Sequence, residues 1–382
     1  MTAFDFQPRT RIVFGPDKID ALGELASEIG GRRALIVSDP GVIAAGHTAR
    51  GIASLVRAGI EVQLFGGVHE NPNTDDVDAG VKLARRHDIQ LIVGLGGGSA
   101  MDCAKGINFL LTNGGEMKDY WGVGKALKPM LPMIAIPTTA GTGSETQSFA
   151  LISDAQTHVK MACGDKKAAC RVAILDPKLT VTQPPRVTSL TGIDAISHAL
   201  ETFVCTKRNA ASLAFSREAW RLLAGHFAKV IDHPTDVEAR GAMLLGASFA
   251  GLAIENSMLG AAHALANPLT THFDIPHGQA VGLMLPHVIR FNSVEVEPWY
   301  LDLLSTMPAN GAGPVPKTVD ELAHFVAALT LKAGLKTKLE ELRVSYDKLP
   351  QLAEEAATQW TGTFNPRKVG AAELLTLYQQ AF

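Results

Sequence analysis

The stretch IQLIVGLGGGSAMDCAK, residues 89–105, decides the fold class of this 382-residue chain. Its first seven residues are mostly apolar, and a short apolar run that ends in glycines predicts a buried strand. Three consecutive glycines (96–98) follow, and Ser99 stands where a helix takes its N-cap. Glycine lets the backbone approach a ligand closely, and the free N–H groups of a helix N-terminus favour a phosphate. The stretch therefore predicts a phosphate site, with an ordinary tight turn as the alternative interpretation.

Strand-like runs recur through the first half of the chain. They occupy residues 35–37, 60–65, 91–93 and 133–136. The first three are spaced by about 28 residues, which suits repeated βαβ units. Helical patterns lie between them. One covers residues 19–29, and the other begins at Thr74, with an N-cap and acidic residues in its first turn. This alternation predicts a mostly parallel, Rossmann-like sheet with helices on both faces.

Strand signals end near residue 186, and long helical patterns follow, interrupted at Pro268 and Pro286 among other prolines. We therefore predict two domains. Residues 1–186 would form an α/β dinucleotide-binding domain, and residues 187–382 an all-helical domain for metal and substrate.

Two segments of the second half have distinctive compositions. Residues 307–316 are rich in proline, glycine and alanine, which predicts a loop. The longest uncharged apolar stretch, residues 241–254, is shorter than the roughly 20 residues that a membrane-spanning helix needs. It predicts a helix buried on all sides within the helical domain.

Composition excludes some classes of partner. The chain has 35 Lys and Arg against 38 Asp and Glu, a net charge of −3, and only 6% aromatic residues. A near-neutral chain with few aromatics offers no footprint for nucleic acid or an anionic membrane surface. No secretory signal is visible, and the four cysteines show no C-x-x-C spacing, so we expect reduced thiols and a cytoplasmic protein.

Two further features at predicted strand ends point to a ligand. The loop PTTAGTGSE, residues 137–145, concentrates hydroxyls and glycines where open α/β sheets bind ligands. Asp39 follows the strand-like residues 34–38. A carboxylate there binds ribose hydroxyls and repels a 2′-phosphate, which favours NAD over NADP. The alternative interpretation of Asp39 is a capping residue before Pro40.

Four residues of the second half form a candidate metal site. Asp194 and His198 are four residues apart, so a helix would place both on one face. His263 lies in an apolar run, and His277 follows a proline at a loop-to-helix junction. Each alone has a structural interpretation, as a core histidine or a hydrogen-bonded pair. Together, one carboxylate and three imidazoles suit Fe²⁺ or Zn²⁺.

Six motifs run in one order over essentially the whole chain. They are GGGSxxDxxK at 96–105, PTTxGTGSE at 137–145, GxDAxxHxxE at 192–201, NxxLGxxHxxAxPL at 256–269, PHG at 276–278 and NPR at 365–367. In these motifs the chain resembles the iron-containing (group III) alcohol dehydrogenase family. The resemblance implies that a small primary alcohol and its aldehyde are interconverted by hydride transfer with NAD. A zinc-dependent, glycerol-type polyol dehydrogenase or a hydroxyacid or semialdehyde reductase of the same superfamily is the alternative.

The resemblance also implies site residues. The metal ligands would be Asp194, His198, His263 and His277, for Fe²⁺ with Zn²⁺ as the alternative ion, and no side chain would act as nucleophile. The implied cofactor contacts are Asp39, Asn71, Gly97, Gly98, Ser99, Asp102, Thr138, Thr139, Thr142, Lys160 and Leu179. A homodimer or a larger homo-oligomer is expected.

The sequence departs from the family pattern at two positions. Many members carry a second histidine four residues after the third ligand, where this chain has Asn267. A proton relay through that histidine is therefore in doubt, and Asn267 would act beside the metal ligands instead. Gln147 stands where a threonine is usual, so contacts near the nicotinamide or the phosphates would differ.

Overall fold

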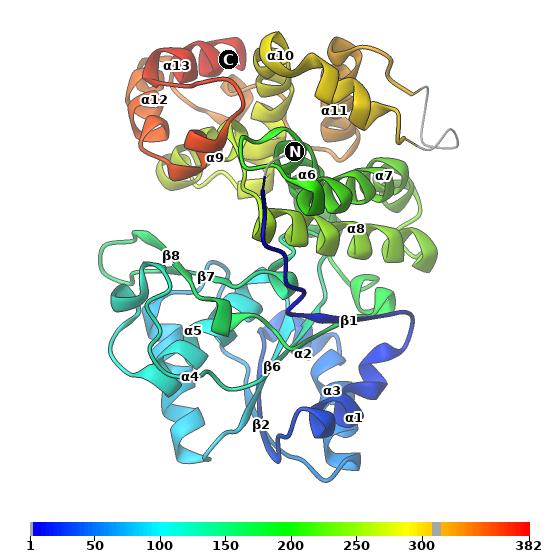
Figure 1. Cartoon of the computed structure of the whole chain (residues 1–382), viewed down its shortest axis with the longest axis vertical. Helices are drawn as coiled ribbons and strands as arrows, with labels where there is room; N and C mark the ends of the chain where they lie inside the picture. The colour runs from blue at the N-terminus through cyan, green and yellow to red at the C-terminus, as the bar shows by residue number, and fades with distance from the viewer. Residues whose placement is uncertain (1–2, 308–314) are drawn as a thin grey trace. The chain divides into compact units, whose positions relative to one another are not determined.

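The computed structural model describes residues 3–307 and 315–382, and its contacts divide the chain into two units (Figure 1). The α/β unit comprises Gln7–Thr139 and Gly143–Gln183, and the helical unit comprises Pro184–Phe382, Ala140–Thr142 and the N-terminal segment up to Phe6. The predicted boundary at residue 186 stays a prediction. Most of the loop predicted at residues 307–316 lies outside the described residues.

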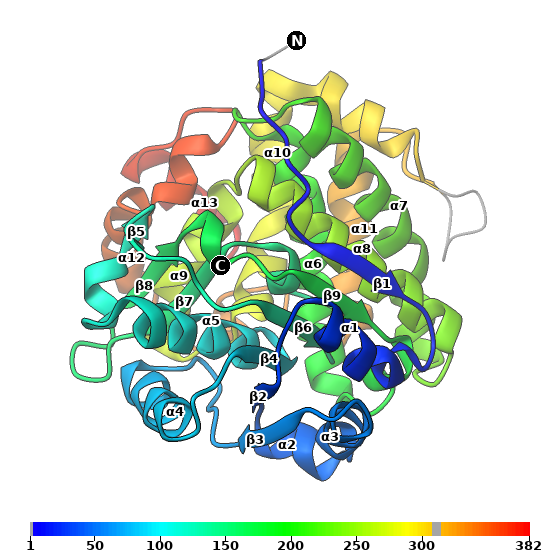
Figure 2. The ribbon, with the colours of Figure 1, turned by 60° about the horizontal axis from the view of Figure 1, so that its bottom comes forward.

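A six-stranded parallel sheet forms the α/β unit, with the strand order β1-β9-β6-β4-β2-β3 (Figure 2). Its strands are β1 (Arg11–Phe14), β2 (Arg33–Val37), β3 (Glu61–Phe65), β4 (Leu91–Gly96), β6 (Met133–Pro137) and β9 (Val172–Leu175). A second, three-stranded sheet contains β5 (Gly122–Val123), β7 (Phe149–Ser153) and β8 (Lys160–Gly164). The four predicted strands are confirmed, whereas no prediction was made for the others.

Helices of the α/β unit cover both faces of the large sheet. They are α1 (Leu22–Glu28), α2 (Pro40–Ala44), α3 (His47–Arg57), α4 (Thr74–Arg86) and α5 (Gly98–Asn113), with short 3-10 turns η1 (Lys18–Ala21), η2 (Met117–Tyr120), η3 (Ser144–Thr146), η4 (Lys166–Ala168) and η5 (Pro177–Thr180). Side chains of β2 alternate between two cores: Leu35 packs with residues of α4 and α5, and Ile36 with residues of α1 and α3. Because both faces are covered, the central strands β4 and β6 are apolar and buried throughout, as parallel strands usually are, whereas β1 and β3 have exposed positions and β3 includes Glu61 and Gln63.

The predicted N-cap of α5 was wrong by two residues, whereas α4 begins at Thr74 as predicted. Helix α5 begins at Gly98 with Gly97 as N-cap, so Ser99 lies inside its first turn. Helix α4 is capped by Asn73, whose side chain accepts hydrogen bonds from the N–H groups of Asp75 and Asp76. In the first case the cap carries no side chain, which leaves the backbone at the glycine turn accessible from outside.

The helical unit is built from α6 onwards. Its helices are α6 (Pro185–Val204), α7 (Ala210–Asp232), α8 (Val237–Asn256), α9 (Ala261–Phe273), α10 (His277–Leu304), α11 (Val319–Lys332), α12 (Leu349–Ala357) and α13 (Ala371–Gln380), with 3-10 turns η6 (Glu340–Leu342), η7 (Tyr346–Lys348) and η8 (Trp360–Phe364). The predicted interruptions at Pro268 and Pro286 were wrong, since both prolines lie inside helices. Both rings are buried, so packing outweighs the single hydrogen bond that each proline removes.

Helix α8 contains the apolar stretch predicted to be a buried helix. Its length and composition would allow it to cross a membrane. However, 67% of its most apolar 18-residue stretch is buried within the protein. This confirms the prediction of a core helix.

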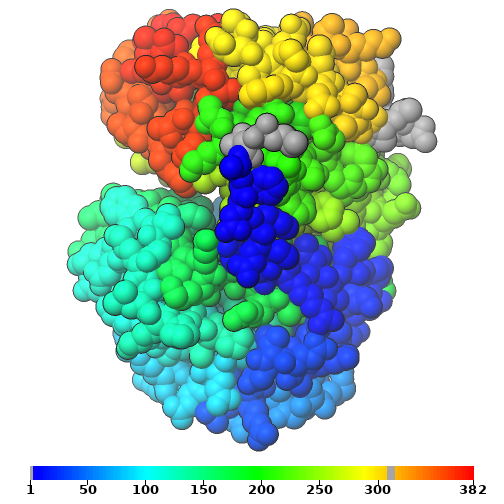
Figure 3. Space-filling model, viewed as in Figure 1, coloured from blue at the N-terminus to red at the C-terminus, as the bar shows by residue number. Residues whose placement is uncertain are grey.

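The N-terminal segment, blue in Figure 3, lies at the surface of the molecule. Phe4 is 51% exposed, whereas the ring of Phe6 contacts Phe215 of α7 at 5.7 Å between centroids. This contact ties the segment to the helical unit.

Candidate metal centre and dinucleotide site

Three helices of the helical unit bring the predicted metal ligands together. Asp194 and His198 lie one turn apart on α6, His263 lies in the first turn of α9, and His277 is the first residue of α10. From Oδ1 of Asp194, the Nε2 atoms lie at 3.5 Å (His198), 3.6 Å (His263) and 3.8 Å (His277). The ligand atoms of Asp194, His263 and His277 all lie within 4.8 Å of one another, and His198 joins them through its approach to Asp194.

The separations fit a divalent cation better than hydrogen bonds. Ligand atoms of a tetrahedral site with bonds of about 2.1 Å are roughly 3.4 Å apart, whereas a hydrogen bond is rarely longer than about 3.2 Å. Oδ1 of Asp194 and Nε2 of His263 are buried, and neither has a hydrogen-bond partner in the part of the chain that the structure describes. Buried polar atoms are nearly always satisfied, so this pair fits residues that hold a positive ion.

Electrostatics also tie these groups together. Burial would raise the pKa of Asp194, but the imidazoles of His198, His277 and His263 hold it well below its usual value. Burial would lower the pKa of His263, but the carboxylates of Glu201 and Asp194 raise it to about 9. For His198, burial dominates and lowers the pKa. Two carboxylates therefore concentrate negative potential at a point that imidazole nitrogens surround.

Glu201 is a site residue for which no role was predicted from the sequence. It is 3% exposed, its Oε2 accepts a hydrogen bond from Nδ1 of His263, and its Oε1 accepts one from the N–H of Ala262 at 2.8 Å. The available signal was its place in the motif, three residues after His198 and seven after Asp194, which puts all three on one helix face.

Asn267 lies one turn after His263 on α9. Its side-chain amide donates to Oε1 of Gln359 at 2.9 Å. A neutral amide pair therefore occupies the place of the usual histidine, and the predicted role of Asn267 beside the metal ligands stays a prediction.

In the α/β unit, several of the predicted cofactor residues lie at the carboxyl ends of β2, β4 and β6. Asp39 follows β2 and caps α2, because its Oδ1 accepts from the N–H of Val42 at 3.0 Å. Its Oδ2 lies so near Gly96 that a Cβ built there would be 3.1 Å away. Thr138 follows β6, and its N–H donates to the carbonyl of Gly96 at 2.9 Å. These positions surround the point where the strand order reverses, which is where open α/β sheets bind ligands.

Three more of the predicted contacts form a polar group beside the glycine turn. The N–H of Asn71 donates to Oγ of Ser99 at 3.3 Å, and Nζ of Lys160 lies 3.4 Å from Oδ1 of Asn71. Asn71 has a positive φ of 53°, a conformation that asparagine tolerates better than most residues.

Some predicted contacts are placed differently. Asp102 accepts a hydrogen bond from Oγ of Ser144 at 2.7 Å, and burial raises its pKa. Lys105 is fully buried and donates to the carbonyls of Ser144 and Phe149. Asp102 thus belongs to an internal network. Thr142 belongs to a short segment that groups with the helical unit, and the cofactor roles of all these residues stay predictions.

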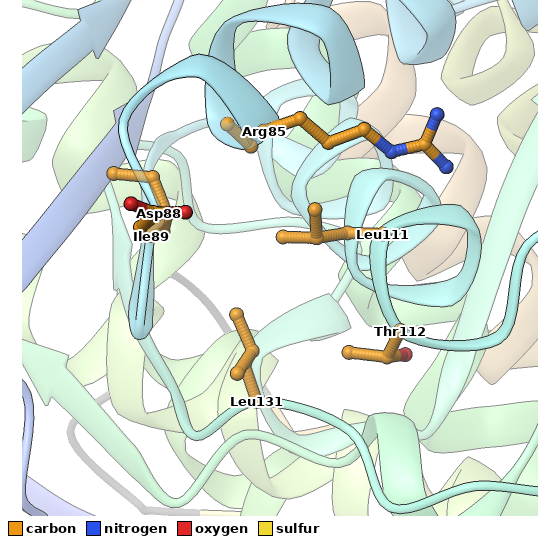
Figure 4. Close-up of a pocket in the computed structure, with 7 residues that line it drawn as sticks. Arg85, Asp88, Ile89, Leu111, Thr112 and Leu131 are labelled. Carbon is orange, nitrogen blue, oxygen red and sulfur yellow. The ribbon is translucent and has the colours of Figure 1, made fainter.

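A surface hollow of the α/β unit, shown in Figure 4, lies elsewhere. It is lined by Ala84, Arg85, Asp88, Ile89, Leu111, Thr112 and Leu131. These residues precede β4 and β6 or end α4 and α5, so the hollow lies at the amino end of the sheet, opposite the glycine turn. It contains none of the predicted site residues.

The fold and the site define a class of protein: two-unit enzymes that combine a parallel sheet of the dinucleotide-binding type with a histidine–carboxylate metal centre. Residues 8–177 match the family described as iron-containing alcohol dehydrogenase, and residues 188–382 match the C-terminal part of the Fe-containing alcohol dehydrogenase family.

Individual relatives agree. The chain is 34% identical to the 1,3-propanediol dehydrogenase of Klebsiella pneumoniae, covering 99% of each chain, and 32% identical to the NAD-dependent methanol dehydrogenase of Bacillus methanolicus, covering 100% of each. The crystal structure of a 1,3-propanediol oxidoreductase superposes with a TM-score of 0.95 at 32% identity over 100% of both chains. The sulfoacetaldehyde reductase of Bifidobacterium kashiwanohense, solved with NAD+, gives 0.91 at 27% identity over 100% of this chain and 99% of that one. The chain belongs to the iron-containing alcohol dehydrogenase family, whose members are alcohol oxidoreductases.

Proposed function

We propose that this protein is an iron-dependent alcohol dehydrogenase that uses NAD to interconvert a small primary alcohol and its aldehyde. The observation that carries the proposal is that three imidazole nitrogens lie 3.5 to 3.8 Å from one buried carboxylate oxygen, and that this oxygen and Nε2 of His263 have no hydrogen-bond partner among the described residues. Relatives described as propanediol, methanol and alcohol dehydrogenases favour this function over a glycerol-type polyol dehydrogenase.

Asp194, His198, His263 and His277 would hold the metal ion. When bound, a divalent iron supplies Lewis acidity, which lowers the pKa of an alcohol oxygen and so favours loss of its proton. Asp194 and Glu201 bring two buried negative charges to the site, which match the charge of a divalent ion. The three imidazoles come from different helices or turns, so packing of α6, α9 and α10 fixes the position of the site.

The glycine turn and Asp39 would hold the dinucleotide. NAD, when bound, supplies the hydride acceptor for oxidation of the alcohol. The N–H groups at the start of α5 would bind its phosphates, and Gly97 as N-cap leaves room for their approach. Asp39 would accept hydrogen bonds from ribose hydroxyls, and its charge would disfavour the 2′-phosphate of NADP.

Location and assembly are further parts of the proposal. The four cysteines are all free and buried, which suits a reducing compartment, and we propose the cytoplasm. We also propose a homo-oligomer, for which the support is the family resemblance alone.

The proposal is tested with purified protein that is stripped by a chelator and reloaded with Fe²⁺ under anaerobic conditions. Absorbance at 340 nm is followed with a panel of small alcohols and aldehydes, with NAD(H) and NADP(H) in parallel. We expect activity that requires metal and prefers NAD. His263→Ala should lose both bound metal and turnover. Full activity of this variant, or of the stripped protein, would refute the proposal.

A further inference from the structure

The buried carboxylate of Glu201 faces two donors at once. On one side, the N–H of Ala262 can only donate, and Oε1 accepts its hydrogen bond at 2.8 Å. On the other side, Oε2 contacts Nδ1 of His263, and a carboxylate can only accept there. We infer that Glu201 is a positioning residue that keeps the proton of His263 on Nδ1 and thereby leaves Nε2 open for the metal ion. This inference rests on the proposed metal centre.

The opposite nitrogen of His263 supports this assignment. Its Nε2 lies 3.6 Å from Oδ1 of Asp194 and has no hydrogen-bond partner among the described residues. A histidine that ligates a metal ion is neutral, with one protonated nitrogen, so when the ion binds, a proton kept on Nδ1 leaves Nε2 with the lone pair that faces the ligand cluster. Carboxylates behind metal-binding histidines act in this way in many metal sites.

The start of α9 explains why the carboxylate comes from another helix. The first N–H groups of a helix need acceptors, and the N-cap residue here is Gly260, which has no side chain. Glu201 serves the N–H of Ala262, and Oδ1 of Asn365 serves the N–H of Ala261 at 3.2 Å. A Cβ built on Gly260 would meet both acceptors at 3.0 Å, so glycine is what allows both to approach.

A simpler hypothesis is that Glu201 only caps α9. Capping of α9 requires only the oxygen that faces the N–H of Ala262. Control of the His263 tautomer requires that the second oxygen, which faces Nδ1 of His263, is an acceptor as well. Replacement of Glu201 by glutamine separates these hypotheses, because glutamine has nearly the same shape but one acceptor and one donor.

In Glu201→Gln, the amide oxygen must face the N–H of Ala262, because the opposite orientation would place two donors against each other. The amide N–H₂ then faces Nδ1 of His263, which must accept, so the proton moves to Nε2. Zn²⁺ affinity, measured by competition with a chromophoric chelator, should fall by about 10- to 100-fold. The metal-free variant should retain the near-UV circular dichroism of the parent.

Asn365→Ala provides the matched control. Asn365 caps the same helix and pairs with Asn292, but its side chain makes no hydrogen bond to His263 among the described residues. This variant should lower the melting temperature while its Zn²⁺ affinity stays within about threefold of the parent, since the tautomer of His263 is unchanged.

A second measurement on the unaltered, zinc-loaded protein keeps the inference testable even where Glu201→Gln does not fold. Histidine ¹⁵N shifts, with the His263 signals assigned by their absence in His263→Ala, should show a protonated Nδ1 and a zinc-bound Nε2. Zinc bound through Nδ1, or parent-like affinity in Glu201→Gln, would overturn the inference and leave the proposed function intact. Failure of the parent protein to bind any metal would overturn both.

Discussion

Gly278→Ala tests how closely α10 must approach α6 for the metal centre to form. Gly278 follows the ligand His277, and a Cβ built on it would lie 2.1 Å from the carbonyl oxygen of Leu190 and 2.8 Å from the carbonyl carbon. Both contacts are with backbone, which cannot rotate away as a side chain can. The substitution therefore forces the start of α10 away from α6.

The size of the effect follows from the distances. Real Cβ atoms essentially never come within 3.0 Å of such an atom, so the gap must widen by about 0.9 Å, the difference between 3.0 and 2.1 Å. Overpacking of this kind costs about 1–3 kcal/mol, which the better helix propensity of alanine offsets by up to about 1 kcal/mol. Because His277 already lies 3.8 Å from Oδ1 of Asp194, the same displacement should weaken metal binding.

Melting temperature and Zn²⁺ affinity of the variant provide the assay. We expect the melting temperature of the metal-free protein to fall by several degrees, since each kcal/mol of lost stability lowers it by about 2–4 °C. We also expect a lower affinity for Zn²⁺. Gly362→Ala is the control, because its Cβ would lie 3.4 Å from the Cβ of Ala264, an ordinary van der Waals contact. This variant should keep the parental melting temperature and Zn²⁺ affinity. A Gly278→Ala protein with parental melting temperature and parental Zn²⁺ affinity would show that the close helix contact is not required.

Three further predictions concern other parts of the chain. Burial raises the pKa of Cys163 to about 12 and that of Cys170 to about 11, so a thiol reagent at about pH 8 should label neither until the protein is unfolded in guanidinium; rapid labelling of the native protein would contradict this. Burial, then Arg290, lowers the pKa of His287 from 6.5 to about 4, so the unfolded chain takes up this proton first and stability falls as the pH drops from 6.5 towards 4. Urea unfolding of His287→Gln should show a shallower loss over that window, and an equal loss would exclude this group as the cause. Lys105→Met removes the donor to two carbonyls, and we expect the free energy of unfolding to fall by roughly 2–5 kcal/mol in the same assay; an unchanged value would mean that other donors replace it.

The sequence was sufficient to predict the central strands because both faces of the sheet are covered. Strands β4 and β6 are buried at every position, and their runs of apolar residues before glycine or proline stand out. By contrast, β7 has an exposed Leu151 and β8 begins at an exposed Lys160, so neither strand is buried along its whole length. Fold class was therefore predictable, whereas the small sheet was not.

The site residues could be predicted from the sequence pattern only where they lie close together along the chain. Asp194 and His198 are related by helical spacing alone, but their approach to His263 and His277 follows from packing of three helices, and only the family resemblance indicated it. The role of Glu201 was missed because its partners lie 61 and 62 residues away. No periodicity within a single helix reports such a contact.

The place of β9 in the sheet affects how the chain can fold during synthesis. β9 lies between β1 and β6, yet it is the last strand of the large sheet to be made, and its partner Arg11–Phe14 is almost the first. At about 5–20 residues per second, the ribosome needs roughly 10–30 s to travel from one to the other. Throughout that interval β1 is without its neighbour, and from the synthesis of residue 137 until that of residue 175 β6 is an open sheet edge. The nascent α/β unit should therefore depend on protection against edge-to-edge association until residue 175 has emerged.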